Sequence, residues 1–317
     1  MKPPSRHITA IVALTLSAAA SLAFAQADPL AQARSLLDAG KIADSETRLR
    51  DFLATHPENA DAHFLLGYAL FREQKAKESL DAFTAGAKYR RPKADELKVV
   101  AADYVMLGDY NDADKWFTEV VAAMPHDADA WYLLGRTRYN ENKFTAAIDA
   151  FQHALAEHPK HVEAENNIGL AWKELNETEK AKAAFQNAID WQGNSPVDPQ
   201  PYLNLGALLA ENDGNDQAIP LLKKAISLAP DNPSGHEELG KVYLAMNNLP
   251  DAQSELEKAV SLSPDASALH YKLGQILRKQ GLTERAQQEF ATCERLNGAH
   301  SSSKIPNPPP PRTPGPQ

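Results

Sequence analysis

Three histidines lie close enough together in the sequence to suggest a metal site. His153, His158 and His161 fall within one short stretch, and a protein-bound metal needs three or four such ligands to converge on one point. His153 belongs to a helical pattern, whereas His158 and His161 flank Pro159, which ends that pattern. The three side chains are therefore expected to be separate surface histidines, and no metal site is predicted.

Two carboxylates, Glu174 and Glu211, form a second candidate site. They occupy the same position in successive repeats of the sequence, and neighbouring helices pack about 8–10 Å apart. That separation is near the one used by inverting glycosidases. With aromatic residues such as Tyr68 and Tyr132, the pair leaves a glycan-binding protein or a groove-built carbohydrate-active enzyme as an alternative hypothesis.

The pattern behind that alternative is weak, because equivalent surface carboxylates are common in an acidic repeat protein. The sequence also contains no glycine-rich phosphate loop, no nucleophile elbow around a serine and no HExxH pattern. We therefore predict that the protein is not an enzyme and that it needs no cofactor.

The elements that carry these residues form an internal repeat. Repeats begin at residues 26, 60, 94, 128, 162, 199, 233 and 267, and only the fifth is longer, through residues 192–198. Position eight of each repeat is Gly or Ala, position twenty is Ser or Ala, and position twenty-four is Leu or Phe. The predicted organisation is a signal peptide over 1–25, repeats over 26–59, 60–93, 94–127, 128–161, 162–198, 199–232, 233–266 and 267–298, and a tail over 299–317.

Each repeat has the pattern of two amphipathic helices, because its apolar residues recur at intervals of three and four. Small residues at positions eight and twenty let the helices approach closely, and the large residue at position twenty-four fills the space beside them. Between the helices lie residues that tolerate left-handed geometry, namely Gly108, Asn142, Asn176 and Gly281. The sequence predicts stacked helical hairpins, with Asp28-Pro29 starting the first helix and Pro220 causing a kink or a late start.

The fourth repeat carries the fullest version of a known motif, Trp131-Tyr132-Leu133-Leu134-Gly135 followed by Ala147, Phe151, Ala154 and Pro159. These residues resemble the tetratricopeptide repeat (TPR) family. The resemblance covers about residues 26–298. It implies an all-α, right-handed superhelical solenoid of eight TPR helical hairpins, whose first helices line a concave groove.

The first residues resemble a secretion signal. Lys2 and Arg6 precede an apolar run over 8–22, and Ala23-Phe24-Ala25 supplies a small-x-small cleavage pattern. We predict cleavage after Ala25, a periplasmic or secreted product, and no stable membrane insertion after cleavage. An uncleaved membrane anchor remains the alternative, because the run could just span a bilayer.

Charge and composition limit the partners. Loss of Lys2 and Arg6 from the 33 basic residues leaves 31 against 42 acidic ones, a net charge of −11. Nucleic acid is therefore not an expected partner, because phosphates require a basic surface. The single Cys293 excludes an internal disulfide, and the proline-rich tail over 299–317 is expected to be disordered.

The resemblance also implies which side chains face a ligand. In this family they lie on the first helix of each repeat, at the positions held here by Phe64, Tyr68, Phe71, Lys98, Tyr132, Arg136, Tyr139, Asn166, Asn167, Lys173 and Asn204. Asn167 and Asn204 share position six and resemble a short asparagine ladder, whose amides suit an extended peptide backbone. The predicted function is an extracytoplasmic scaffold that binds a protein or peptide partner in the groove. The sequence specifies neither the partner nor the oligomeric state.

Overall fold

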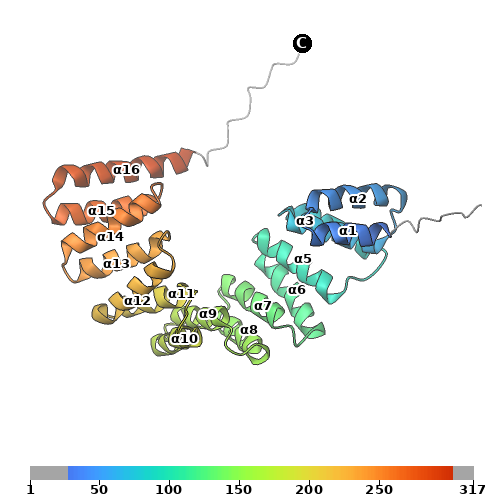
Figure 1. Ribbon diagram of the computed structural model, residues 1–317, viewed down its shortest axis with the longest axis horizontal. Coiled ribbons are helices and arrows are strands. Elements are labelled where there is room, and N and C mark those ends of the chain that lie inside the picture. Colours follow the sequence, from blue (N-terminus) through green and yellow to red (C-terminus); the bar gives the residue numbers. More distant parts are fainter. Residues whose placement is uncertain (1–27, 303–317) are drawn as a thin grey trace, which may run out of the picture. The chain divides into compact units, whose positions relative to one another are not determined.

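The computed structural model describes residues 28–302 of the chain (Figure 1). The signal segment and residues 303–317 of the predicted tail lie outside this range. Within it the protein is all-α, as predicted, with sixteen helices and no strand. The helices are α1 (Pro29–Asp38), α2 (Ile42–Thr55), α3 (Ala60–Arg72), α4 (Ala76–Ala87), α5 (Ala94–Met106), α6 (Tyr110–Ala123), α7 (Ala128–Asn140), α8 (Phe144–Glu157), α9 (Val162–Glu174), α10 (Thr178–Trp191), α11 (Gln200–Glu211), α12 (Asn215–Leu228), α13 (Pro233–Ala245), α14 (Leu249–Leu262), α15 (Ser267–Lys279) and α16 (Thr283–Ser302).

The chain divides into two compact units at Pro92 and Lys93. Unit 1 contains α1 to α4, and unit 2 contains α5 to α16. The boundary falls between the second and third repeats, where the repeat columns of the sequence continue without a break. The division was therefore not predicted.

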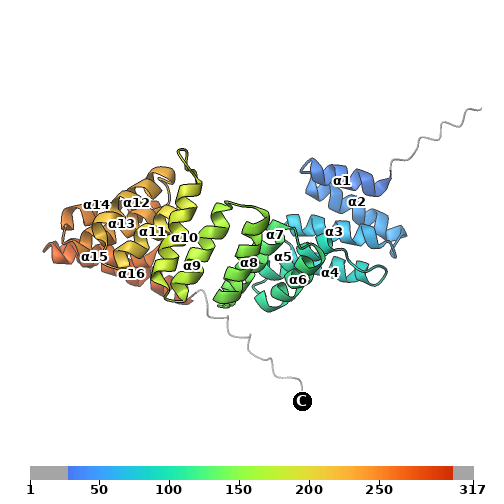
Figure 2. The same ribbon diagram turned by 90° about the horizontal axis from the view of Figure 1, so that it is seen from below.

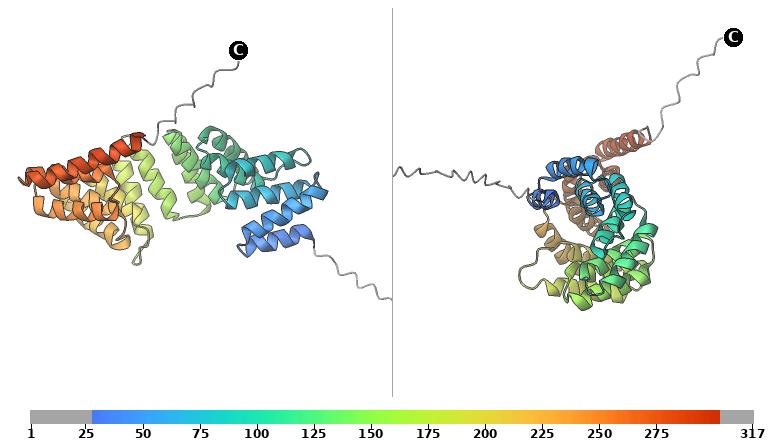
Figure 3. Two further views of the ribbon diagram at one scale, coloured as in Figure 1. Left: turned by 90° about the horizontal axis from the view of Figure 1, so that it is seen from above. Right: turned by 90° about the vertical axis from the view of Figure 1, so that its right-hand side faces the viewer.

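Helical hairpins stack in the same way within each unit. The two helices of a hairpin pack on each other, as α3 does on α4 and α7 on α8. The second helix of one hairpin then packs on the first helix of the next, as α8 does on α9 (Figure 2). The same antiparallel pairing is visible for the hairpins coloured orange and red in Figure 3. This is the TPR-type solenoid that the repeat predicts.

The core is built from the small and large positions of the repeat. Phe151 and Phe185, both at position twenty-four, are fully buried. They fill the space left by the missing side chains of Gly135 and Gly169, where an added Cβ would lie 2.5 Å from the ring. A side chain at either glycine would force the ring out of a close-packed core.

The turns inside the hairpins confirm the predicted left-handed residues. The φ angles of Gly108 and Gly281 are +76° and +80°, and those of Asn142 and Asn176 are +61° and +60°. Glycine has no Cβ to oppose this conformation, and asparagine tolerates it better than most residues. At these four turns the residue type in the sequence therefore indicates where the first helix ends.

Helix ends agree with the sequence in part. The carboxylate of Asp28 accepts a hydrogen bond from the backbone N–H of Leu30 (3.1 Å), which caps α1 ahead of Pro29. Of the kink or late start expected at Pro220, the late start is wrong, because α12 begins at Asn215 and includes the proline. Helix α16 continues to Ser302, so residues 299–302, which the sequence analysis assigned to the tail, are helical. No described helix has the length and apolar character needed to cross a bilayer.

Candidate functional site

Three first helices of unit 2 bring several of the predicted ligand-facing residues together. Helix α9 contacts both α7 and α11, so one surface runs across all three. We call this surface the α7–α9–α11 face and define it by Tyr132, Arg136, Asn166, Asn167 and Asn204. These residues come from the fourth, fifth and sixth repeats, and the hairpin stacking places them side by side.

Tyr132 is held in place from several directions. Its ring stacks on the imidazole of His161 with 4.8 Å between centroids, and the Arg136 guanidinium lies 5.8 Å from the ring centroid. Its hydroxyl oxygen accepts a hydrogen bond from Nδ2 of Asn167 (3.2 Å). Burial raises the pKa of Tyr132, so the hydroxyl is protonated at neutral pH and can still donate a hydrogen bond to a ligand.

Two asparagines from neighbouring repeats form a direct pair. Nδ2 of Asn204 donates to Oδ1 of Asn166 (2.9 Å). Asn166 is only 6% exposed, so its amide has little freedom to rotate. The sequence paired Asn204 with Asn167 instead. In the structure Asn167 donates to Tyr132. Asn204 on α11 bonds Asn166, the residue before Asn167 on α9.

The lysines predicted at the site serve a different purpose. Nζ of Lys98 lies 2.8 Å from Oδ2 of Asp127, the last residue of the same repeat, which caps helix α7 of the next repeat. Burial would raise the pKa of Asp127, but the hydrogen bonds from Lys98 and from the backbone of Ala130, together with the charge of Lys98, outweigh burial and lower that pKa. Nζ of Lys173 similarly lies 2.8 Å from Oε1 of Glu211 in the next repeat. Both lysines therefore connect successive repeats.

The predicted residues of unit 1 do not belong to this face. Phe64 is 3% exposed, and the guanidinium of Arg90 lies 4.5 Å from its ring centroid. Phe64 is therefore a core residue of unit 1, and its assignment as ligand-facing is wrong. Tyr68 accepts a hydrogen bond from Arg72 (3.3 Å), and Phe71 is half-buried on the same helix, α3.

The remaining aromatic and acidic candidates have separate environments. Tyr139 packs edge-on against Phe144, with centroids 5.4 Å apart. Burial and, to a smaller extent, the charge of Glu174 raise the pKa of Tyr139. Glu211 is paired with Lys173. The two carboxylates of the glycan hypothesis thus have different partners, and Tyr68 and Tyr132 belong to different units.

The histidines take part in ring contacts. His153 stacks on Trp131 with centroids 4.2 Å apart, and His158 meets His161 edge-on at 5.3 Å. Across the described residues no group of three or more His, Cys, Asp or Glu side chains is arranged to hold a metal ion.

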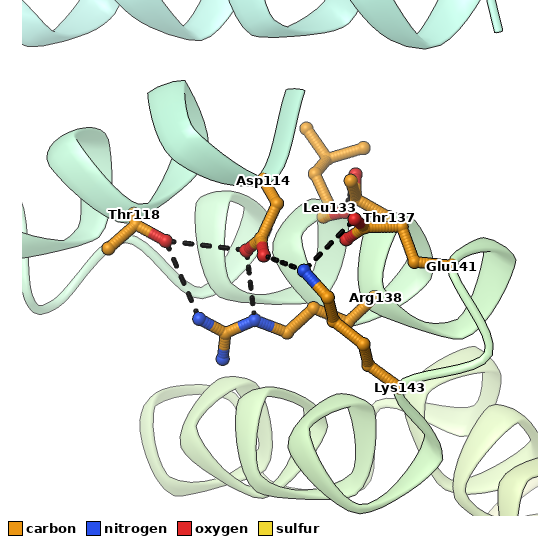
Figure 4. A network of polar contacts seen from close by, with 7 residues as sticks. All are labelled: Asp114, Thr118, Leu133, Thr137, Arg138, Glu141 and Lys143. Carbon is orange, nitrogen blue, oxygen red and sulfur yellow. Dashed lines mark hydrogen bonds and ion pairs between the residues drawn. The ribbon is translucent and has the colours of Figure 1, made fainter. Parts of the chain in front are cut away.

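A network of charges in unit 2 was missed by the sequence analysis (Figure 4). Asp114 on α6 accepts hydrogen bonds from Nε of Arg138 (3.0 Å) and Nζ of Lys143 (2.8 Å). Lys143 also lies 2.9 Å from the carboxylate of Glu141. The available signal was an acidic residue at position twenty-one followed by a lysine at position sixteen of the next repeat.

Family models agree with the repeat pattern. Models described as tetratricopeptide repeat match residues 30–95, 208–259 and 237–295. The model of the cilia and flagella-associated protein 70 middle TPR-like domain matches residues 97–221. Together these matches cover nearly all of the described helices.

Matches to characterised proteins are partial. The chain is 26% identical over 143 residues to human protein O-mannosyl-transferase TMTC3, which covers 41% of the chain and 16% of that protein. It is 25% identical over 150 residues to bovine BBSome complex member BBS4, covering 47% and 28%. It is 28% identical over 131 residues to protein FlbA of Caulobacter vibrioides, covering 41% and 22%. The chain thus matches less than a third of the length of each relative.

Solved structures share the fold. A tetratricopeptide repeat protein from Parabacteroides merdae aligns with a TM-score of 0.62 at 18% identity, covering 78% of this chain and 97% of that one. The Cut9–Hcn1 structure of the APC/C aligns with a TM-score of 0.59 at 17% identity, covering 85% and 53%. PilW, a type IV pilus biogenesis factor, aligns with a TM-score of 0.58 at 21% identity, covering 67% and 95%.

Proposed function

Because the chain belongs to the tetratricopeptide repeat family, whose solenoids offer long surfaces for protein partners, we propose that it is a scaffold that binds an extended segment of a partner protein on the α7–α9–α11 face. The proposal rests on this face because it combines a fixed aromatic ring, a cation and paired amides within three adjacent repeats.

The observation that carries the proposal is the Asn166–Asn204 pair. Its hydrogen bond uses an N–H of Asn204 and the carbonyl oxygen of Asn166. The carbonyl oxygen of Asn204 and the amide nitrogen of Asn166 are left to accept from and donate to a peptide group. Because the pair is already ordered, binding a backbone to it costs little side-chain entropy.

Arg136 supplies the charge preference. Lys98 and Lys173 are both ion-paired, whereas none of the described residues forms an ion pair with Arg136, which is exposed above Tyr132. The carboxylate of an acidic residue of the partner would form a bidentate ion pair with this guanidinium. We therefore infer that the bound segment carries a carboxylate close to the part held by the asparagines.

We further propose that the chain acts outside the cytoplasm. The support is the basic start, the apolar run over 8–22 and the cleavage pattern at Ala23-Phe24-Ala25. Intact-mass analysis of the protein recovered from cells tests this point. The expected mass is that of a chain starting at Gln26, and a full-length chain in the cytosol would contradict it.

Site-specific photo-crosslinking in cells tests the binding face. Tyr139 lies one turn after Arg136 on α7 and so borders the face. We expect a photoreactive phenylalanine analogue in its place to crosslink a partner polypeptide. The same analogue in place of Lys223, which is exposed on α12, should not. The combined substitution of Asn166 and Asn204 by Ala should reduce the crosslink by about thirtyfold, since each of the two lost hydrogen bonds costs about 1 kcal/mol.

A matched control is Asn111→Ala, an exposed asparagine of α6 outside the face. It should leave the crosslink unchanged. Equal crosslinking from positions 139 and 223 would contradict the proposed face.

The glycan-binding alternative has less support. Glu211 is paired with Lys173, and the transferase named among the relatives matches over only 16% of its length. We propose a non-catalytic protein that requires no cofactor. Hydrolysis or transfer on a saccharide that disappears in Glu174→Gln would overturn this proposal.

A further inference from the structure

The first hairpin of unit 1 has a shallow, open hollow. Its volume is about 550 Å³, and the lining residues come from α1 and α2: Pro29, Asp44, Thr47, Arg48, Asp51 and Phe52. We call it the first-repeat socket. It lies in the other compact unit from the α7–α9–α11 face, so it is argued independently of that face.

The same place is filled by a side chain in later repeats. In the fourth repeat, Trp131 at position four stacks on His153 at position twenty-six. Its indole N–H donates to the carbonyl oxygen of Pro125 (2.8 Å). The residue at position four therefore covers the second helix of its own repeat and reaches back toward the preceding one.

The eighth repeat shows the same arrangement with an imidazole. Nδ1 of His270 lies 2.6 Å from the carboxylate of Glu289, at position twenty-three, and Nε2 lies 2.8 Å from the carbonyl oxygen of Pro264. Both ring nitrogens face oxygen atoms. In the seventh repeat, Nδ1 of His236 likewise lies 2.6 Å from the carboxylate of Glu255.

The first repeat has side chains at the two second-helix positions of this arrangement but lacks an aromatic or imidazole ring at position four. Arg48 and Asp51 occupy positions twenty-three and twenty-six, but position four is Pro29. The proline side chain is closed onto its own backbone and carries no N–H. The hollow is thus where rings such as those of Trp131 and His270 lie in later repeats.

The charge of the socket favours a basic group. Asp44 and Asp51 are exposed, and neither forms an ion pair with any described residue. Arg48 is held by a hydrogen bond to the side chain of Gln32. Phe52 supplies the apolar wall and stacks on His56 with centroids 4.3 Å apart.

From these observations we infer that the first-repeat socket binds an aromatic residue of a partner polypeptide, and that this polypeptide carries a positive charge next to the aromatic ring. The ring takes the place that position four fills in later repeats and packs against Phe52 and Pro29. The adjacent cation pairs with Asp44 and Asp51. Aromatic residues that fill a recess inside a polar rim are frequent anchors of protein interfaces.

Saturation-transfer NMR on the full-length chain tests the inference with tryptamine, which combines an indole with an ammonium group. We expect transfer from the protein to the indole protons. Asp51→Lys should lower the signal by about fivefold, in line with the loss of an exposed charge pair. Thr47→Trp, which places a ring in the socket, should lower it to a similar extent.

Two controls make the result specific. Indole-3-acetate has the same ring with the opposite charge and should give a signal several-fold weaker than tryptamine. Asp38→Lys makes the same charge change on α1 outside the socket and should leave the tryptamine signal unchanged. The inference is overturned if the full-length chain gives no transfer to tryptamine, or if Asp51→Lys, Thr47→Trp and Asp38→Lys behave alike in variants whose circular dichroism is native.

Discussion

The two units contain ion-pair networks at identical repeat positions. In unit 1, Lys75 lies 3.1 Å from Glu46 and 2.5 Å from Glu73. In unit 2, Lys143 lies 2.8 Å from Asp114 and 2.9 Å from Glu141. In both cases the acids stand at positions twenty-one and fourteen and the lysine at position sixteen.

The arginine of each network comes from a different place. Arg50 lies one turn after Glu46 on the same helix and is 53% exposed. Arg138 reaches Asp114 from the following repeat and is 18% exposed. The Arg50–Glu46 pair stabilises mainly its own helix, whereas the Arg138–Asp114 pair joins two repeats. The shared acids and lysine therefore do not fix how many ion pairs cross between repeats, because the arginine that completes each network stands at a different repeat position.

The pKa values of Glu46 and Asp114 are both lowered, but the largest cause differs between them. The hydrogen bond from Arg50 is the main cause of the lowered pKa of Glu46. Burial alone would raise the pKa of Asp114, but the hydrogen bonds from Lys143 and Arg138 outweigh burial and lower it. The two carboxylates are about equally exposed, at 15% for Glu46 and 16% for Asp114, so the networks differ in the exposure of their arginines and not of their acids.

The largest expected difference comes from removing each arginine while keeping its apolar stem. Arg138→Met should destabilise α6 to α8 by about 2 kcal/mol, because the arginine and the carboxylate of this pair are both largely shielded from water. Arg50→Met should cost about 0.3 kcal/mol, the typical value of an exposed i,i+4 pair. Hydrogen exchange resolved by mass spectrometry measures both, and equal losses of protection would remove the distinction.

The second prediction concerns pH. Because the folded-state pKa of Asp114 is lowered, its charge contributes stability above its unfolded pKa, and that stability is lost as the pH falls through the folded pKa. The free energy of unfolding of the wild type should exceed that of Asp114→Asn by about 1 kcal/mol at neutral pH. The gap should close only below the ordinary value of 3.8. Urea unfolding across this range checks the sign, and a gap that widens in acid would contradict it.

A third prediction uses a carboxylate that pairs with no cation among the described residues, as a contrast to the networks. Glu165 is 8% exposed, and burial raises its pKa despite a hydrogen bond from Asn187. A raised folded pKa penalises folding above the unfolded value. Glu165→Gln should therefore stabilise the protein by about 1 kcal/mol at neutral pH, with the gain disappearing below about pH 4.

The matched control for that experiment is Glu174→Gln on the exposed end of the same helix. It should change the stability by less than about 0.5 kcal/mol at any pH. Thermal unfolding at neutral and acidic pH separates the two variants. Equal behaviour would mean that burial is not the cause.

The smallest effect is that of salt. Raising the ionic strength from about 0.05 M to about 0.5 M should remove most of the roughly 0.3 kcal/mol from Arg50 but only part of the contribution of Arg138, because solvent-exposed pairs are screened more completely. Hydrogen exchange of the two arginine variants at both salt concentrations checks this. Equal salt sensitivity would contradict the difference in burial.

The sequence predicted the candidate site only in part. Residue type and repeat position identified Tyr132, Arg136 and Asn166 as members of one surface. The same rule placed Phe64 there, but Phe64 faces the space opened by Gly86 and is covered by Arg90. A position rule cannot distinguish these cases, because the orientation of a ring depends on the free volume beside it.

By itself the sequence determined the helical hairpins and their turns. Gly135 and Phe151 must pack together, and Asn142 must turn, because steric and backbone preferences act between residues close in the repeat. Only the tertiary structure decided that Asn204 pairs with Asn166, that Arg138 reaches Asp114, and that the chain divides at Pro92. Those outcomes depend on distances between side chains of different repeats, which a one-dimensional pattern does not contain.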